Sequence, residues 1–452
     1  MAQPEKSIGE INERIRDGSV RVVNASEMTK IVAELGPEAA LHEVDVVTTG
    51  TFGAMCSSGV WMNFGHSEPP IKMSRVWLND VEAYAGVAAV DAYLGATRPS
   101  ETHGIEYGGG HVIEDLIRRR PVTLRAQGYG TDCYPSRSIS TEIVIDELNQ
   151  ATMSNPRNCY ERYGVATNTS NKTLYTYMGK LLPDAGNANY SGAGELSPIA
   201  NDPVYATIGV GTRVLLGGAE GFVVGSGTQH SPITGFGTLM LQGDLKQMSP
   251  EFIRGATITG YGSTLYVGVS VPIPVLNVDI ARRAGVSDAD ITTSVFDYGV
   301  PSRSRPVLAQ VNYEELKSGA IEVRGREVKT SSLSSLKMAL RVAELLKRRI
   351  ASGDFLLSAA VEPLRSKDTV APMVQRTPRG TRVSAGSPPV PDDQLVRLDE
   401  TRCVHCGLCV AICPCGVYSQ DTSGTVSYRP DECTGCRECA DVCPQRAILV
   451  RG

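Results

Sequence analysis

Cys403-x-x-Cys406-x-x-Cys409-x-x-x-Cys413-Pro414 is followed by a second copy of the same spacing, Cys433-x-x-Cys436-x-x-Cys439-x-x-x-Cys443-Pro444. Three cysteines at this spacing wrap a tight loop around one cubane of iron and sulfur, and the fourth, followed by proline, reaches across to the other cubane. Because the segment is an internal repeat, each half should be a strand, a loop and a short helix, related by pseudo-twofold symmetry. The pattern predicts two 4Fe-4S clusters.

The repeat also predicts which cysteines share a cluster. Zinc accepts thiolates too and is the alternative, but zinc sites usually separate two C-x-x-C pairs by a longer stretch. The triple spacing with proline resembles bacterial two-cluster ferredoxins over residues 395–452. We expect one cluster on Cys403, Cys406, Cys409 and Cys443, and the other on Cys433, Cys436, Cys439 and Cys413.

The composition of the 452-residue chain excludes several classes of partner. Charged residues make up 21% of it and the net charge is −5, so no basic patch favours nucleic acid. The first residues lack the layout of a signal peptide, and no apolar run approaches the roughly 18 residues of a membrane span. Since most of the 12 cysteines are assigned to clusters, we expect a cytoplasmic protein in a reducing, anaerobic cell.

Helix and strand signals alternate before the cysteine repeat. Apolar residues recur at helical spacing over residues 7–17, with Ser7 as the expected cap and Glu10 three residues on, and over residues 332–352. Residues 112–120 read as a helix that Pro121 ends. Residues 44–49 and 122–125 read as strands, followed by loops rich in small residues over 50–59 and 127–135. Glycine and β-branched residues over 140–275 predict several short strands joined by tight turns.

These signals divide the chain into two domains. Prolines, serines and glycines over residues 384–391 are typical of a stiff linker. We predict a mixed α/β (α+β) domain over residues 1–380, a linker over 381–394, and a small ferredoxin-like α+β domain with two 4Fe-4S clusters over 395–452.

Two of the remaining cysteines lie in the predicted loops. The thiolate is the reactive form of cysteine, and backbone amides or a nearby cation favour it. Cys56 follows a strand, and Cys133 has Arg137 close behind it in sequence. The alternative for any single cysteine is a small buried hydrophobic residue, and Cys56 suits that alternative better than Cys133 does. Cys159 and Cys415 have no assigned role.

Three histidines lie in or beside glycine-rich loops, where a proton donor would have room to act: His103, His111 and His230. A hydrogen-bonded structural role is the more frequent one for such residues. The glycine runs themselves match neither a Rossmann nor a phosphate-loop pattern, so the sequence does not support a nucleotide site.

Longer segments resemble one known family. The region over about residues 7–375 resembles the homocysteine-biosynthesis family of anaerobes and methanogens. The segments that carry the resemblance are 49–59 (TGTFGAMCSSG), 61–66 (WMNFGH), 72–80 (KMSRVWLND), 101–103 (ETH), 111–116 (HVIEDL) and 129–135 (YGTDCYP). This chain departs from one common form of the family, which carries regulatory CBS modules after the catalytic part, because a ferredoxin-like segment follows here instead.

The resemblance implies a function for residues 1–380. Members of the family are similar to sulfurtransferases that convert L-aspartate 4-semialdehyde to homocysteine with sulfide-derived sulfur, using two cysteines matched here by Cys56 and Cys133. Replacing the aldehyde oxygen by sulfur loses water and still requires two electrons and two protons, because a thioaldehyde is more oxidised than a thiol. On this interpretation the fused clusters supply the electrons, drawn from an external low-potential donor, and the cysteines carry a persulfide or form a thiohemiacetal.

Substrate-binding residues are predicted from chemistry alone. A planar guanidinium fits a carboxylate with two hydrogen bonds, which makes Arg75, Arg125 and Arg137 candidates, with His103 as a further polar contact. A homo-oligomer is compatible with the sequence. Two other functions remain open: a ferredoxin-linked oxidoreductase acting on another aldehyde or thiol, and a non-enzymatic electron-transfer or sulfur-carrier subunit.

Overall fold

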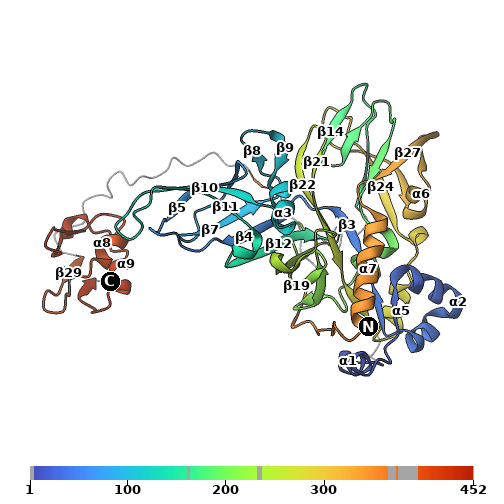
Figure 1. The fold of residues 1–452 in the computed structure, drawn as a ribbon, viewed down its shortest axis with the longest axis horizontal. Coiled ribbons are helices and arrows are strands. Elements are labelled where there is room, and N and C mark those ends of the chain that lie inside the picture. Colours follow the sequence, from blue (N-terminus) through green and yellow to red (C-terminus); the bar gives the residue numbers. More distant parts are fainter. Residues whose placement is uncertain (1–4, 160–162, 232–236, 365–372, 375–394, 451–452) are drawn as a thin grey trace. The chain divides into compact units, whose positions relative to one another are not determined.

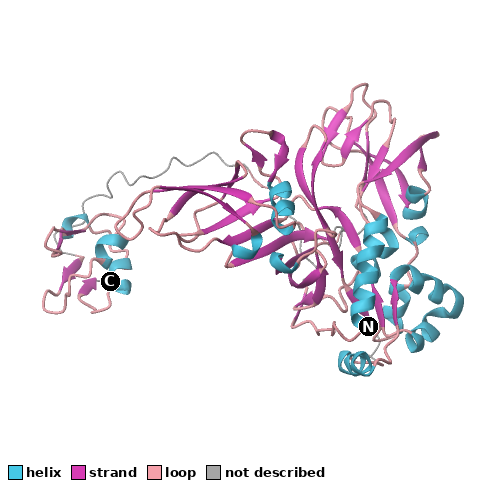
Figure 2. Ribbon diagram, viewed as in Figure 1, coloured by secondary structure: helices cyan, strands magenta, loops and turns pink. Residues whose placement is uncertain are grey.

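The computed structural model describes residues 5–159, 163–231, 237–364, 373–374 and 395–450 (Figure 1). The chain divides into two compact units, Met1–Ala371 and Pro372–Gly452. The linker predicted over residues 381–394 lies outside the described residues. Helices and strands are mixed in both units, and strands predominate (Figure 2). This arrangement confirms the mixed α/β (α+β) class.

The first unit begins with two capped helices. In α1 (Ile8–Asp17), the Ser7 hydroxyl accepts a hydrogen bond from the Glu10 amide, and the Glu10 carboxylate accepts one from the Ser7 amide. This reciprocal cap is the one expected from the sequence over residues 7–17. Helix α2 (Ala25–Glu43) is kinked at Gly36, where φ is +81°, next to a proline inside the helix.

A sheet of nine strands forms the centre of the first unit. Its neighbours pair in the order β21-β22-β18-β19-β20-β12-β4-β7, and β3 pairs with β22. All the ladders of this sheet are antiparallel. The strands are β3 (Thr51–Ala54), β4 (Gly59–Asn63), β7 (Asp91–Gly95), β12 (Gln150–Asn158), β18 (Arg213–Leu216), β19 (Ala219–Gly225), β20 (Leu239–Asp244), β21 (Ile253–Ile258) and β22 (Gly262–Ser270).

Two six-stranded sheets and one of three strands flank this centre. The first runs β11-β10-β5-β6-β8-β9, and the second runs β25-β24-β13-β16-β27-β26 with parallel pairs at β13–β24 and β16–β27. Their strands are β5 (Met73–Leu78), β6 (Val81–Ala83), β8 (Pro99–Ser100), β9 (Gly104–Gly108), β10 (Val122–Gly128), β11 (Ser138–Ile143), β13 (Val165–Thr167), β16 (Ala188–Tyr190), β24 (Thr292–Asp297), β25 (Val307–Asn312), β26 (Ala320–Val323) and β27 (Arg326–Ser332). The three-stranded sheet contains β1 (Val22–Asn24), β2 (Val46–Thr48) and β23 (Pro272–Pro274), and two further pairs join β14 (Leu174–Thr176) to β15 (Gly179–Leu181) and β17 (Gly209–Val210) to β28 (Glu362–Pro363).

The long helix α7 (Leu336–Ala351) packs on the centre of this unit. It contacts β22, β3 and β1, and its buried face includes Val342 and Leu346. Gly50, just before β3, lies so close to this helix that a Cβ atom there would be 2.1 Å from the Ala339 carbonyl oxygen. The remaining helices of this unit are α3 (Gly109–Ile117), α4 (Pro198–Asn201), α5 (Val278–Ala284) and α6 (Tyr313–Lys317).

Several predicted elements differ from the structure in their limits, and three of them show why. Residues 50–59, expected as a loop, contain β3, because Phe52 and Gly53 pair with β22 in the buried sheet. The helix expected over 112–120 is α3, which begins earlier at two buried glycines and ends at Ile117. The helix expected over 332–352 begins later, because residues up to Ser332 belong to β27.

The second unit shows the symmetry expected from the cysteine repeat. Each C-x-x-C-x-x-C loop leads into a five-residue helix, α8 (Leu408–Ile412) or α9 (Glu438–Val442). Two short antiparallel pairs complete the unit: β29 (Val396–Leu398) with β32 (Ile448–Val450), and β30 (Tyr418–Gln420) with β31 (Val426–Tyr428).

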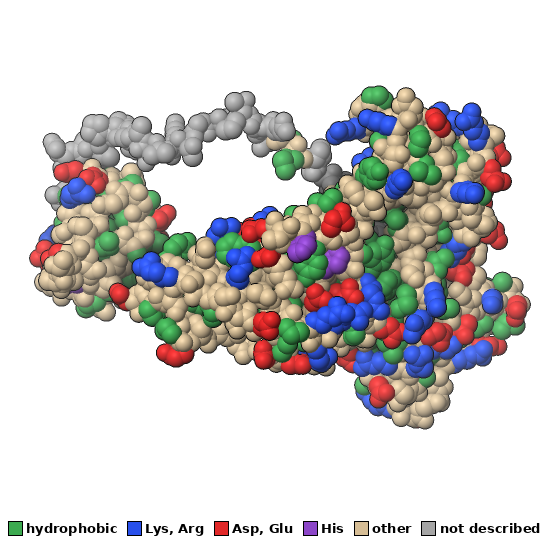
Figure 3. All heavy atoms as spheres, turned by 45° about the horizontal axis from the view of Figure 1, so that its top comes forward, with side chains coloured by type: hydrophobic (Ala, Val, Ile, Leu, Met, Phe, Trp, Pro, Cys, Tyr) green, Lys and Arg blue, Asp and Glu red, His purple; other side chains and the backbone are tan. Residues whose placement is uncertain are grey.

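Surface charge follows the composition. Acidic and basic side chains are interspersed over the face drawn in Figure 3, in agreement with the small net charge of −5. In the part of the chain that the structure describes, no helix is both long and apolar enough to cross a membrane.

Candidate functional site

Cys56 lies at the end of β3, where this strand leaves the central sheet. Ala54 pairs with Tyr266 of β22, and the Met55 amide donates to the Leu265 carbonyl at 2.7 Å, so the backbone is held until one residue before the cysteine. The Cys56 sulfur then lies 3.4 Å from the hydroxyl of Thr264, which is fully buried. The thiol itself is partly exposed, which leaves it accessible to a ligand.

The thiol opens into a cavity of about 400 Å³ between the central sheet and the sheet that contains β13 and β24. This volume is in the range of small-molecule sites. Two guanidinium groups line it, and none of its described lining residues is acidic. The polar residues that bear on the chemistry are Cys56, Arg157, Tyr177, Gln229, Tyr261 and Arg305.

One tyrosine of the cavity, Tyr261, keeps its proton. Burial raises the pKa of Tyr261, and the nearby charges of Cys56 and Tyr177 add to the rise, whereas Arg157 opposes it. Tyr261, Cys56 and Arg157 all line this one cavity. A phenol that stays protonated can donate a hydrogen bond to an oxygen atom bound in the cavity.

Arg305 is held at the cavity by aromatic rings. Its guanidinium lies 4.3 Å from the centre of the Tyr298 ring and donates to the Tyr177 hydroxyl at 3.3 Å. The hydroxyls of Tyr177 and Tyr298 are themselves 2.8 Å apart. The guanidinium is thus oriented by cation–π and hydrogen-bond contacts with neutral groups.

Cys133 lies elsewhere in the same unit. It is exposed in the turn that joins β10 to β11, where the amides and carbonyls of Thr131 and Tyr134 bond to each other and the Tyr134 ring stacks on His66 at 6.0 Å. Figure 1 shows the β10–β11 hairpin extending away from β3. Cys133 does not line the cavity of Cys56, so the structure does not bring the two cysteines together.

The arginines singled out from the sequence occupy other places. Arg75 pairs with Glu82 at 3.1 Å, Arg125 pairs with Asp80 at 2.7 Å, and both guanidinium groups lie over the Trp77 ring. Arg137 is exposed on the β10–β11 hairpin. In the described chain, the side chain of the exposed His103 contacts Thr102 and Tyr107. None of these predicted residues lines the cavity of Cys56.

The other histidines and Cys159 are placed structurally. The half-buried His111 accepts a hydrogen bond from the Gly108 amide at 3.2 Å, and burial lowers its pKa. His230 is buried and bonds to the backbone of Thr238. Burial raises the pKa of the Cys159 thiol, so this thiol stays protonated and packs in the core.

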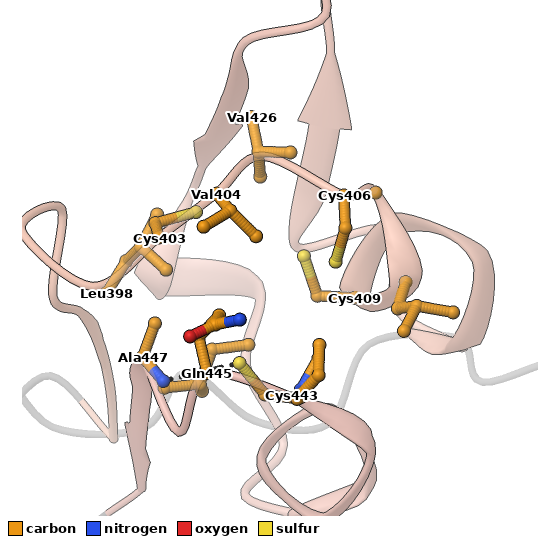
Figure 4. Close-up of a pocket in the computed structure, with 13 residues that line it drawn as sticks. Leu398, Cys403, Val404, Cys406, Cys409, Val426, Cys443, Gln445 and Ala447 are labelled. Atoms are coloured by element: carbon orange, nitrogen blue, oxygen red, sulfur yellow. Dashed lines mark hydrogen bonds between the residues drawn. The ribbon is translucent and has the colours of Figure 1, made fainter.

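In the second unit, one set of cysteines surrounds a single hollow. Figure 4 shows Cys403, Cys406, Cys409 and Cys443 lining one pocket together with apolar residues such as Leu398. The set therefore combines three cysteines of the first repeat with the last cysteine of the second, which is the combination expected from the spacing.

The remaining cysteines form a second group. Burial raises the pKa of the Cys439 thiol, and the neighbouring thiols of Cys413, Cys433 and Cys436 raise it further. Cys413, Cys433 and Cys436 are therefore each within electrostatic reach of Cys439.

Backbone amides point at the cysteine sulfurs. The His405 amide donates to Cys403 and the Gly435 amide to Cys433, each at 3.4 Å, and the Ala447 amide donates to Cys443 at 3.2 Å. Such donors stabilise the negative charge of cluster thiolates and influence the reduction potential. The residues present therefore fit an iron–sulfur site.

Sequence reasoning missed Arg157, Tyr177, Tyr261 and Arg305. These residues come from four separate segments of the chain, and no local motif marks any of them. Only the position of Cys56, in a glycine-rich stretch directly after a strand, was visible in the sequence.

Comparisons with known proteins give matches to both parts of the chain. The family described as "Homocysteine biosynthesis enzyme, sulfur-incorporation" matches residues 20–357, and a "4Fe-4S dicluster domain" matches residues 402–447. The chain is 57% identical over 371 residues to an L-aspartate semialdehyde sulfurtransferase of Methanosarcina acetivorans, covering 82% of this chain and 74% of that protein.

Two further relatives extend the likeness. An L-aspartate semialdehyde sulfurtransferase of Methanocaldococcus jannaschii is 56% identical over 374 residues, which is 79% of this chain and 73% of the relative. An uncharacterized protein of Methanothermobacter thermautotrophicus is 30% identical over 433 residues, which cover 93% of this chain and 86% of that protein. The chain belongs to the homocysteine biosynthesis family and carries a 4Fe-4S domain at its C-terminal end.

Proposed function

We propose that this protein converts L-aspartate 4-semialdehyde to L-homocysteine with sulfide-derived sulfur, and that Cys56 is the thiol that meets the aldehyde. The observation that carries the proposal is the thiol of Cys56 opening into a cavity of substrate size beside two guanidinium groups. The names of the two relatives with 57% and 56% identity supply the reaction.

The first step uses groups of the cavity. The Cys56 thiolate adds to the aldehyde carbon, so that a carbon–sulfur bond forms, the carbonyl double bond opens and its oxygen takes up a proton from solvent. Hydrosulfide then displaces the Cys56 thiolate, which breaks the bond to Cys56 and leaves the sulfide sulfur on the carbon, and loss of water and the two-electron reduction follow. Tyr261 retains its proton because burial raises its pKa, and its hydroxyl stabilises the developing oxyanion by donating a hydrogen bond. Thr264, bonded to the sulfur at 3.4 Å, holds the thiolate in place.

The overall reaction needs two electrons. Aldehyde, hydrogen sulfide, two electrons and two protons give the thiol and water. Bound 4Fe-4S clusters, two in this proposal, would supply those electrons, received from an external low-potential donor in the cytoplasm. Cys403, Cys406, Cys409 and Cys443 would hold one cluster, and Cys433, Cys436, Cys439 and Cys413 the other.

Cys133 is assigned the role of the second redox-active thiol. It is exposed on the β10–β11 hairpin, where it can exchange sulfur or disulfide with an incoming thiol. Cys133 does not line the Cys56 cavity. Exchange between Cys133 and Cys56 therefore requires the β10–β11 hairpin to approach the cavity, or another thiol to carry the sulfur or the disulfide between them.

An anaerobic assay tests the function. Cluster-reconstituted protein is given aspartate semialdehyde, sulfide and a low-potential reductant, and homocysteine is followed by mass spectrometry. We expect product from the natural chain, at least 100-fold less from Cys56→Ser and from Cys133→Ser, and a normal rate from Cys159→Ala, which alters a thiol of the core. Full activity in Cys56→Ser, or no product from the natural chain with intact clusters, would overturn the proposal.

A further inference from the structure

The two guanidinium groups of the Cys56 cavity have different partners from several other arginines of the described chain. Arg75, Arg125 and Arg213 each pair with a carboxylate of the chain at 3.1 Å or less. In the described ranges, Arg157 donates to the side-chain carbonyl of Gln229, and Arg305 bonds to a tyrosine hydroxyl. Both of these partners are neutral, and the two guanidinium groups line a cavity with no described acidic residue.

We infer that Arg157 and Arg305 form the subsite for the substrate's carboxylate, an inference that rests on the proposed function and specifies its recognition step. A guanidinium presents two parallel N–H donors to a carboxylate, and such charge-assisted pairs are the strongest hydrogen bonds in proteins. Both groups line the same cavity as Cys56. A short amino acid that carries a carboxylate at one end and an aldehyde at the other can therefore contact the guanidinium groups and the thiol together.

Neighbouring side chains orient the guanidinium groups of Arg157 and Arg305. Arg157 is half-buried at the end of β12, and Arg305 is kept in position by the Tyr298 ring at 4.3 Å and by Tyr177. Side chains that are already oriented lose little conformational freedom when a ligand binds. The carboxylate would replace a neutral partner of Arg157, the Gln229 carbonyl, without breaking an ion pair within the described chain.

The subsite also sets the specificity. Because none of the described lining residues is acidic, the cavity binds the carboxylate of the substrate more strongly than its ammonium group. An aldehyde that keeps the carboxylate and lacks the amine, 4-oxobutanoate, should be processed better than one that keeps the amine and lacks the carboxylate, 3-aminopropanal. We expect kcat/KM for the two to differ by about 10-fold or more, in favour of the acid.

Alkylation of Cys56 tests the subsite without requiring turnover. Iodoacetate carries a carboxylate and iodoacetamide does not, and peptide mass spectrometry reports the rate at Cys56, with the exposed Cys133 as internal reference. We expect the iodoacetate-to-iodoacetamide rate ratio at Cys56 to fall about 10-fold in the Arg157→Gln/Arg305→Gln variant. Arg303→Gln is the matched control, since Arg303 is exposed nearby in the chain and does not line the cavity.

A second pair of variants separates loss of charge from loss of fold. Arg157→Lys and Arg305→Lys keep the positive charge, so they should retain most of the iodoacetate-to-iodoacetamide rate ratio at Cys56. The melting temperature of every variant is measured as a check on folding. An unchanged ratio in a folded double glutamine variant would overturn the inference, even if the natural chain makes homocysteine. A fall in the ratio in a chain that makes no homocysteine would support the anion subsite and refute the proposed function.

Discussion

Removal of one hydroxyl beside Cys56 should slow its chemistry. Thr264→Val replaces the Oγ1 atom, 3.4 Å from the Cys56 sulfur, by a methyl group of similar size. Thr264 is fully buried on β22, so no water replaces the lost donor without a rearrangement of the sheet. The substitution therefore acts on one hydrogen bond and leaves the shape of the cavity wall nearly unchanged.

The expected magnitude follows from the charge on the sulfur. A hydrogen bond to a charged group contributes about 1.5–3 kcal/mol, and about 1.4 kcal/mol corresponds to a factor of ten. The lower limit applies to Thr264, since a contact of 3.4 Å to a large, polarisable sulfur is weak for its class. We expect the thiolate reaction of Cys56 to slow by about 10-fold in Thr264→Val.

Two measurements examine this prediction. The first is the rate of iodoacetamide alkylation at Cys56 at pH 7, and the second is kcat for homocysteine formation, which should fall in parallel. Thr264→Ser is the control, because it retains the hydroxyl while it removes the methyl group, and it should react within about twofold of the natural chain. If valine and serine gave the same rate, the hydroxyl would have no role in the reactivity of Cys56.

Three further predictions concern the rest of the molecule. Cys443→Ser should lose about half of the bound iron, measured after anaerobic reconstitution, because it removes one ligand of one cluster. Gly50→Ala should destabilise the first unit by about 2 kcal/mol in urea unfolding, since its Cβ would be 2.1 Å from the Ala339 oxygen, whereas Gly95→Ala, with open space around the new atom, should cost far less. His111, whose pKa is lowered by burial, is protonated more readily in the unfolded chain; stability should therefore fall as pH drops from about 7 to about 5, and His111→Gln should flatten this decline.

Local patterns in the sequence predicted local structure well. The Ser7–Glu10 cap fixed the start of α1, since both hydrogen bonds are made within one helical turn. The cysteine repeat predicted the symmetry of the second unit, and Cys443 lines one pocket with three cysteines of the first repeat, whereas their sharing of one cluster stays a prediction. In both cases the interacting residues are close in sequence or related by a repeat, so that spacing alone carries the information.

The limits of several elements depended on distant pairing. Thr51–Ala54 is rich in small residues and resembles a loop, but it pairs with β22, more than 200 residues further along the chain. Tertiary contacts of this kind override local propensity. For the same reason the sequence identified Cys56 as a candidate but could not show what surrounds it.

The arginines show why the charge and hydrogen-bond donors of a side chain do not by themselves identify the residue that binds a substrate carboxylate. Arg75 and Arg125 were reasonable candidates, yet each already has a carboxylate partner in the folded chain. A ligand carboxylate that approached Arg75 would have to displace Glu82 and would gain little, because one charge-assisted bond would be exchanged for another. At Arg157 the same ligand would replace the neutral Gln229 carbonyl, so the exchange would gain a charge-assisted bond. What distinguishes a binding arginine from a structural one is therefore the partner that the fold supplies, and that partner depends on residues distant in the sequence.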